Sequence, residues 1–144
     1  MTQQKIIFSL EEIGEVAKQL WSLRDSCAVY TFTGPLGAGK TTLVKEILKQ
    51  AGVREVTTSP TFTYVNVYKV NDQTLYHFDL YRIQSLDEFL RQGFDEYLYL
   101  SKSWSFIEWP EVIEPLLKKN VCQISLDYHG SDKRELVFKE KKGQ

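Results

Sequence analysis

The sequence predicts an α/β fold whose sheet is parallel at its centre and carries antiparallel hairpins as additions. Short apolar runs rich in β-forming residues alternate with segments that repeat apolar residues at helical spacing. Two further pairs of alternating runs are separated by turn residues, near Asn71 and near Gly130, as in hairpins. Its 144 residues suit one domain, residues 1–144.

Strands and helices alternate in the first part of the chain. Residues 5–8 are a short strand candidate, and residues 9–12 have the S-x-x-E spacing of a capping box. A helix is expected over residues 10–23, where apolar residues recur every three or four positions. Residues 27–32, CAVYTF, are short and apolar, which is typical of a strand buried at the centre of a sheet. Helical spacing returns over residues 40–51.

The middle of the chain contains a hairpin followed by a helix. Residues 63–70 and 74–81 are rich in β-forming residues and flank a turn, which predicts two antiparallel strands. A second capping box at residues 85–88 opens a helix that Gly93 interrupts. We expect the helix to continue over residues 94–100.

The last part of the chain adds a strand, a helix and a second hairpin. Residues 104–108 form a short strand candidate, and residues 110–119 a short helix with two lysines at its C-terminal end. Residues 121–128 and 134–138 alternate around HGSDK, as the two strands of a hairpin do. The charged tail from residue 140 onward is expected to be flexible.

A glycine-rich loop, GPLGAGKT at residues 34–41, fits the phosphate-binding pattern G-x-x-x-x-G-K-[ST] at every fixed position. Gly37 and Gly39 allow the backbone N–H groups to curl around phosphate oxygens. Lys40 would reach the terminal phosphates, and the Thr41 hydroxyl would lie on Mg²⁺. A buried strand enters the loop and a helix leaves it, which predicts a P-loop NTPase-like three-layer α/β/α fold.

Two acidic residues end strands that could flank this loop. A P-loop enzyme needs such an acid to hold Mg²⁺, directly or through water. Asp79 follows LYHF and Glu108 follows WSFI, so one acid could bind the metal while the other orients the attacking water. The alternative is that either is a surface carboxylate. His77 shares a strand face with Asp79 and is favoured as a structural residue, with a hydrogen bond near the site as the alternative. Trp109 is favoured as a packing residue.

The segment TTSPT at residues 57–61 reads as a loop, since Pro60 lacks an N–H donor and restricts the residue before it. In this fold class a loop at this position can sense the terminal phosphate. Thr61 could then supply a hydroxyl to the site, and a plain structural turn is the alternative.

The composition is that of an ordinary globular protein. Apolar residues make up 42% and the formal net charge is −1, so no global basic field exists to hold nucleic acid by charge alone. Cys27 and Cys122 lie in separate apolar runs and are expected to be buried thiols in a reducing cytosol. Neither a signal peptide nor an apolar run of the roughly 20 residues that span a bilayer is visible, so a cytoplasmic protein is expected.

Sequence motifs narrow the class of nucleotide-using protein. A regulatory GTPase needs a guanine-reading N-K-x-D motif, which is absent, and the D-x-x-G at residues 127–130 lies in the late hairpin. A small nucleoside or nucleotide kinase would need a lid with converging arginines. The five arginines are scattered, so the kinase is kept as the alternative. The favoured class is a minimal ATPase that acts on, or is activated by, a partner protein.

Four blocks in order, GPLGAGKTT, SPTFTY, YHFDLYR and EWPE, resemble the TsaE family of bacterial P-loop ATPases, which serves tRNA threonylcarbamoyladenosine biosynthesis. The resemblance covers nearly the whole chain. It implies an ATPase that uses ATP and Mg²⁺ and works with the partner proteins TsaB and TsaD. Those partners modify the adenosine beside the anticodon, so this chain would contact tRNA at most indirectly.

The resemblance also implies roles for individual residues. The phosphates would be bound by Gly37, Ala38, Gly39, Lys40, Thr41 and Thr42. Thr41 and Glu108 would ligate Mg²⁺, and Lys40, Asp79 and Glu108 would form the catalytic set, with Asp79 as a catalytic or water-positioning acid. Thr61 would lie in a switch-like loop that contributes to nucleotide binding.

The family also holds the nucleotide with its N-terminal segment, here near Ser9 and Glu11, and with its last hairpin, here Arg134. One position departs from the family pattern. Pro35 replaces the acidic residue that usually follows the first glycine of the loop. We expect nucleotide binding to survive this change, whereas an interaction made by the acid, for example with a partner, would be lost.

Overall fold

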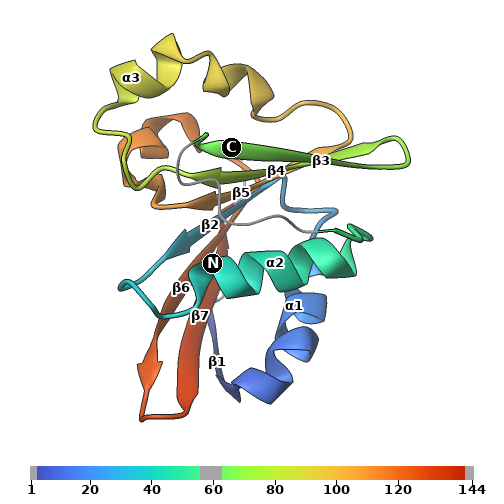
Figure 1. Cartoon of the computed structure of the whole chain (residues 1–144), viewed down its shortest axis with the longest axis vertical. Helices are drawn as coiled ribbons and strands as arrows, with labels where there is room; N and C mark the ends of the chain where they lie inside the picture. Colours follow the sequence, from blue (N-terminus) through green and yellow to red (C-terminus); the bar gives the residue numbers. More distant parts are fainter. Residues whose placement is uncertain (1–2, 56–62, 142–144) are drawn as a thin grey trace.

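The computed structural model describes residues 3–55 and 63–141 (Figure 1). Within these residues a seven-stranded sheet has the order β1-β7-β6-β2-β5-β4-β3. The strands are β1 (Gln3–Ser9), β2 (Val29–Thr33), β3 (Val65–Val70), β4 (Gln73–Asp79), β5 (Ser103–Glu108), β6 (Val121–His129) and β7 (Lys133–Lys141). All seven predicted strands are therefore present, with small shifts of their ends.

The sheet is parallel at its centre and antiparallel at both edges, as predicted. β2 pairs in parallel with β6 and β5, and β5 pairs in parallel with β4. β7 pairs antiparallel with β6 and β1 with β7, while β3 pairs antiparallel with β4. In the register of β4 and β5, Asp79 lies opposite Glu108. The two candidate acids therefore end neighbouring strands at the same edge of the sheet.

Helices cover both faces of the sheet and complete three layers (Figure 1). One layer contains η1 (Leu10–Glu12), α1 (Ile13–Trp21) and α2 (Lys40–Gln50); the other contains α3 (Leu86–Arg91), η2 (Phe94–Tyr97) and η3 (Pro110–Leu116). On the α2 side, Leu43 and Ile47 pack in one core with Phe32. On the α3 side, Phe89 and Phe94 pack with other sheet residues in a second core. The three-layer α/β/α prediction is confirmed.

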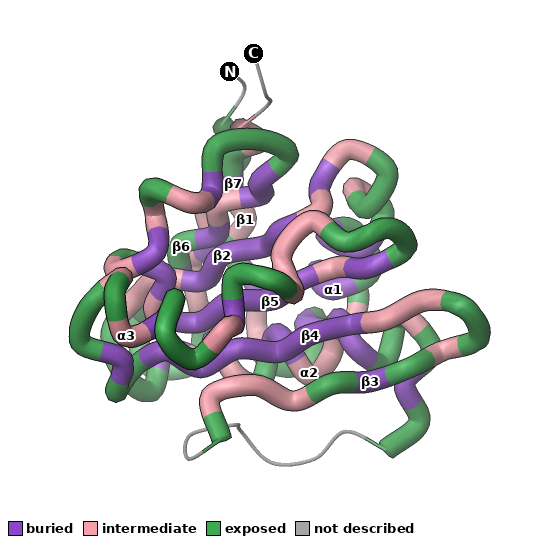
Figure 2. Tube along the Cα trace, turned by 90° about the horizontal axis from the view of Figure 1, so that it is seen from above, coloured by how far each residue is buried: buried purple, intermediate pink, exposed green. Residues whose placement is uncertain are grey.

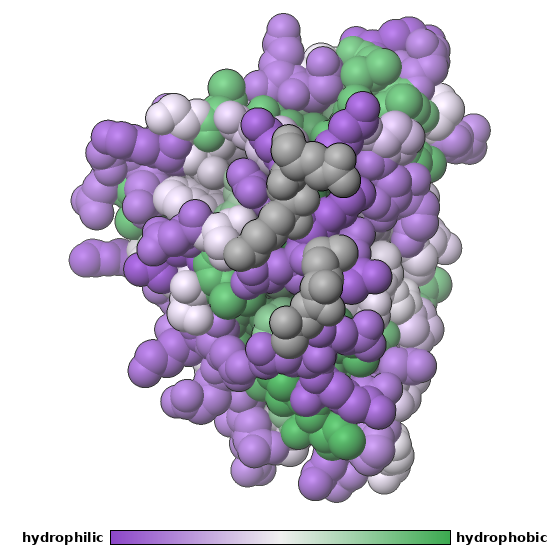
Figure 3. Space-filling view, turned by 180° about the vertical axis from the view of Figure 1, so that it is seen from behind, coloured by the Kyte–Doolittle hydropathy of each residue, from purple (hydrophilic) through white to green (hydrophobic). Residues whose placement is uncertain are grey.

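Burial is concentrated in the strands that lead to the loop. Figure 2 shows β2, β4 and β5 running through the middle of the molecule as largely buried segments. From behind, the surface is mainly hydrophilic with apolar side chains interspersed (Figure 3). Cys27 and Cys122 are buried, as expected. No helix in the described part of the chain is long and apolar enough to cross a membrane.

Three segments differ from the prediction. The stretch expected to continue as helix to residue 100 is a short 3₁₀ helix that ends at Tyr97, and Tyr99 has a positive φ of 62°. The segment after β5 is a 3₁₀ helix rather than an α-helix; Pro115 inside it lacks an N–H for helical hydrogen bonding. Glu140 and Lys141, expected in a flexible tail, instead belong to β7, where β6 supplies their hydrogen-bonding neighbours.

Candidate active site

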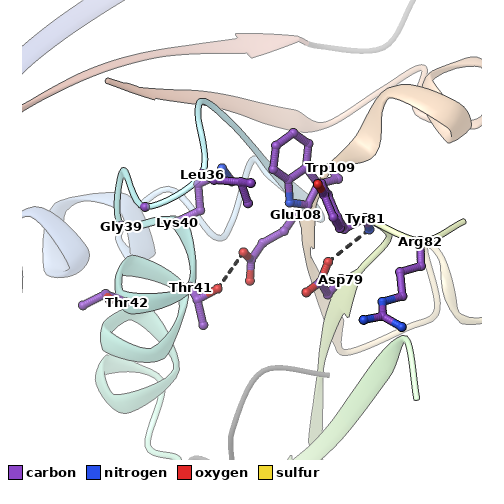
Figure 4. Close-up of a pocket in the computed structure, with 11 residues that line it drawn as sticks. Leu36, Gly39, Lys40, Thr41, Thr42, Asp79, Tyr81, Arg82, Glu108 and Trp109 are labelled. Carbon is purple, nitrogen blue, oxygen red and sulfur yellow. Dashed lines mark hydrogen bonds between the residues drawn. The ribbon is translucent and has the colours of Figure 1, made fainter. Parts of the chain in front are cut away.

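A cavity of about 450 Å³ lies where the loop after β2 meets the carboxyl ends of β4 and β5 (Figure 4). The loop and the first turn of α2 form one wall, and the ends of the two strands with the turns that follow them form the other. The residues that line it are Leu36, Gly37, Gly39, Lys40, Thr41, Thr42, Asp79, Tyr81, Arg82, Glu108 and Trp109. The phosphate-binding motif and both predicted acids therefore face the same space.

The loop requires glycine at positions where the backbone is left-handed or closely packed. Gly34 has a φ of 140°, and a Cβ there would overlap the backbone carbonyl of Leu126 on β6. Gly37 has a φ of 80°, and its Cβ would lie 2.8 Å from the hydroxyl of Tyr128. The glycine backbone of the loop therefore packs directly against β6, in a space that a side chain at Gly34 or Gly37 would fill.

The β6–β7 hairpin supports the loop from the side opposite the acids. The Tyr128 hydroxyl donates to the Leu36 carbonyl at 2.9 Å, and Arg134 Nε donates to the Ala38 carbonyl at 3.2 Å. The Arg134 guanidinium also lies 4.8 Å from the centre of the Tyr128 ring. Both bonds are made to loop carbonyls and so occupy none of the loop N–H groups, of which that of Ala38 donates to the Pro35 carbonyl at 3.2 Å.

Lys40 is 95% buried at the mouth of the loop. Its Nζ donates to the carbonyls of Gly34 at 2.6 Å and Pro35 at 3.0 Å, and it lies 4.2 Å from the centre of the Trp109 ring. Burial lowers the pKa of Lys40, an effect that nearby carboxylates led by Glu108 oppose. An ammonium group has three donors, so the loop carbonyls orient Lys40 while one donor stays available to a phosphate.

Thr41, Glu108 and His77 form a chain of hydrogen bonds that runs from the cavity into the buried sheet. The Thr41 hydroxyl donates to Glu108 Oε1 at 2.7 Å, and Glu108 Oε2 lies 2.6 Å from His77 Nε2. Asp79, next to Glu108, accepts a hydrogen bond from the backbone N–H of Tyr81 at 3.1 Å (Figure 4). A hydroxyl and a carboxylate that converge are oxygen donors of the kind that Mg²⁺ prefers.

A second cavity of about 320 Å³ lies on the other side of the loop. It shares Gly37, Gly39 and Thr42 with the first cavity. The loop residue Ala38 also lines it, together with apolar side chains from the start of the chain and part of the last hairpin: Phe8, Leu10, Ile13, Ser131, Asp132 and Arg134. An apolar wall continuous with a phosphate-binding loop has the shape and chemistry to hold a nucleoside.

Of the contacts predicted from the N-terminal segment and from the last hairpin, this cavity includes only the one from the hairpin. Arg134 lines it, but Ser9 and Glu11 do not, and the backbone N–H of Ser9 is bound to Glu12 at 2.9 Å. A role of Ser9 and Glu11 in nucleotide binding stays a prediction. Thr61 lies outside the described residues.

Sequence reasoning missed three residues around the first cavity. Tyr81 and Arg82 line it, and Tyr128 supports the loop through its hydrogen bond to the Leu36 carbonyl. Trp109, favoured as a packing residue, has a left-handed backbone with φ of 59° and places its ring 4.9 Å from that of Tyr81. Tyr81 and Arg82 lie two and three residues after the acid Asp79, which could have indicated their place, whereas nothing local indicates Tyr128.

The fold and the glycine loop together define the class of protein. A central parallel strand leads through the loop into a helix, and the helix N-terminus faces an acid on the neighbouring strand, so the fold is that of a P-loop NTPase. The model of one family, threonylcarbamoyl adenosine biosynthesis protein TsaE, matches residues 7–136. The chain belongs to the TsaE family, which acts in threonylcarbamoyladenosine biosynthesis.

Individual relatives agree with this assignment. The tRNA threonylcarbamoyladenosine biosynthesis protein TsaE of Bacillus subtilis is 36% identical over 128 residues, which cover 89% of this chain and 79% of that protein. The protein of the same name from Rickettsia bellii is 35% identical over 135 residues, covering 93% and 92%. The crystal structure of Bacillus subtilis YdiB matches with a TM-score of 0.70 and 30% identity, covering 95% of this chain and 84% of that one.

Proposed function

We propose that this protein is a Mg²⁺-dependent ATPase that serves the threonylcarbamoyladenosine modification of tRNA together with TsaB-like and TsaD-like partner proteins. The observation that carries the proposal is the 2.7 Å bond between the Thr41 hydroxyl and Glu108, directly beside Lys40. This arrangement puts a cation, a hydroxyl and an acid at the N-terminus of one helix, where an anion is favoured. We further propose that the protein works in the cytoplasm, as expected of a protein with two buried thiols.

The nucleotide would occupy both cavities. Its phosphates would lie on the loop N–H groups and Lys40, and its base and sugar would lie against Leu10 and Ile13 near Arg134. The shared residues Gly39 and Thr42 would then lie between the two halves of the ligand. ATP and ADP would both fit this mode, since the difference between them lies at the end nearest Lys40.

The donor set fits a magnesium ion held jointly by protein and nucleotide. In the part of the chain that the structure describes, no three His, Cys, Asp or Glu side chains come together to hold a metal. Mg²⁺ commonly takes one or two protein oxygens and completes its shell with phosphates and water. Thr41 and Glu108 would supply those protein oxygens. The bound ion would neutralise charge on the phosphates during hydrolysis.

We assign Asp79 to the attacking water and Glu108 to the metal. It ends β4 opposite Glu108 and is 92% buried beside the cavity, while its partner acid is already bonded to Thr41 and His77. A carboxylate held in this position can accept a hydrogen bond from a water and orient it toward the terminal phosphate. Lys40 would stabilise the charge that develops on the phosphate oxygens.

The test measures phosphate release from ATP in the presence of Mg²⁺, first with the protein alone and then with TsaB-like and TsaD-like proteins added. Hydrolysis that the two partners stimulate supports the proposal. A lack of phosphate release under all conditions contradicts it. Transfer of the phosphoryl group to a nucleoside or nucleotide acceptor would instead identify the small kinase that the sequence left as the alternative.

A further inference from the structure

We infer that His77 is a positioning residue that holds the Glu108 carboxylate ready to bind a divalent cation; this inference rests on the metal site proposed above. His77 does not line the cavity and would touch neither nucleotide nor metal. Its part in the reaction would be exerted entirely through Glu108.

His77 and Glu108 form a polar pair in the buried part of the sheet. His77 is fully buried and Glu108 is 2% exposed, yet both side chains are polar. His77 Nε2 lies 2.6 Å from Glu108 Oε2. In the sheet, His77 pairs with Phe106, two residues before Glu108, so His77 and Glu108 are diagonal neighbours on the face covered by α2. The contact is therefore built into the strand register and does not depend on a flexible loop.

The hydrogen-bonding groups define what His77 contributes. A carboxylate that binds a cation is ionised and can only accept, so in the proposed site Nε2 would carry the proton and donate to Glu108 Oε2. Nδ1 is the buried side-chain atom without a hydrogen-bond partner among the described residues. A positively charged ring would place an unpaired N–H donor at that buried position. We therefore assign the neutral tautomer with the proton on Nε2, in which His77 supplies a donor and not a charge.

This donor matters most when a metal is bound. Thr41 and His77 each hold one oxygen of Glu108, as the two bonds at 2.7 and 2.6 Å show. When a metal binds the Thr41 oxygen and Glu108, His77 would still donate to Oε2 and keep the carboxylate in place. Without His77, Glu108 would be free to rotate, and its buried Oε2 would lack a donor.

The experiment compares two substitutions at His77 that distinguish the hydrogen-bond donor on Nε2 from the packing of the imidazole ring. His77→Gln keeps an N–H donor with a reach similar to that of Nε2, whereas His77→Leu removes it. Tyr76→Phe is the matched control, because Tyr76 is the preceding residue of β4 and packs in the core on the opposite face of the sheet. Binding of Mn²⁺ to each protein with ADP is followed by the electron paramagnetic resonance signal of free Mn²⁺, and ADP binding is measured separately in EDTA.

We expect His77→Leu to weaken Mn²⁺ binding by about 10- to 100-fold, the usual effect of losing such an outer partner. His77→Gln and Tyr76→Phe should stay near the wild-type value, and all four proteins should bind ADP alike in EDTA. If His77→Leu does not fold, His77→Asn replaces it, since its shorter amide cannot reach Glu108, and the same loss is expected.

Three results would overturn the inference, and each has a different consequence for the proposed metal site. Wild-type Mn²⁺ affinity in a folded His77→Leu or His77→Asn protein removes the role of His77 but leaves the metal site intact. Failure of the wild-type protein itself to bind Mn²⁺ with ADP removes the proposed metal site, and the inference with it. Equal losses in His77→Leu and His77→Gln would show that the ring, and not its donor, is what Glu108 needs.

Discussion

Replacing Gly34 with alanine should destabilise the protein by displacing the phosphate loop from β6. Gly34 has a φ of 140°, a region that residues with a Cβ rarely adopt, and this strain costs about 1–3 kcal/mol. The new Cβ would also overlap the backbone carbonyl of Leu126, which cannot move aside like the end of a side chain. Overpacking of this kind costs a further 1–3 kcal/mol or so. We expect a total loss of about 4 kcal/mol in the free energy of unfolding.

The assay is thermal unfolding followed by circular dichroism, in which this loss should lower the midpoint by roughly 10 °C for a domain of this size. Gly14→Ala is the matched control, because Gly14 lies inside α1 and no atom would come within 4 Å of its new Cβ. That substitution should stabilise the protein by up to about 1 kcal/mol through higher helix propensity. A Gly34→Ala protein that melts with the wild type would refute the packing of the loop against β6.

Three further substitutions probe the site itself. Thr41→Val removes a proposed metal ligand and the hydroxyl that donates to Glu108. A hydrogen bond to a charged group is worth about 1.5–3 kcal/mol, so the Mg²⁺ concentration for half-maximal turnover should rise at least about tenfold. An unchanged Mg²⁺ requirement contradicts the proposed ligand. Asp79→Asn should lower the turnover number more than it weakens ATP binding measured by calorimetry; a change in Mg²⁺ requirement instead would mean that the two acids exchange roles. Tyr128→Phe removes the donor to the Leu36 carbonyl and should lower the free energy of unfolding in urea by about 0.5–1.5 kcal/mol; no loss would show that this bond does not hold the loop.

The elements that the sequence predicted correctly are those that local pattern determines. The apolar run before the glycine loop is the central strand β2, and the hairpin around Gly130 forms as β6 and β7. The missed features depend on single residues whose effect overrides the apolar spacing. Tyr99 adopts a positive φ shortly after η2, and Pro115 interrupts helical hydrogen bonding in η3. Helical spacing of apolar residues alone does not distinguish these short 3₁₀ segments from α-helix.

Within the candidate site, the sequence indicated Lys40 and the two acids because a motif and strand ends place them. The contacts that support the loop and Glu108 could not be predicted from motifs or strand ends. Tyr128 is 92 residues from Leu36, and His77 is 31 residues from Glu108. Those pairs meet only because the sheet brings β6 beside β2 and β4 beside β5. The pairing of strands that lie far apart in the sequence decides which side chains support the loop and Glu108, and local sequence patterns do not reveal that pairing.

The central claim is that the loop around Lys40 hydrolyses ATP, and phosphate release by a Lys40→Ala protein tests it most directly. The substitution removes the cation beside the Gly34 and Pro35 carbonyls. Circular dichroism should show a folded protein, because those carbonyls lie in a surface loop that water can reach. We expect Mg²⁺-dependent turnover, measured with and without the partner proteins, to fall to the level of a blank without enzyme. Turnover equal to that of the wild type would contradict the assignment of this site.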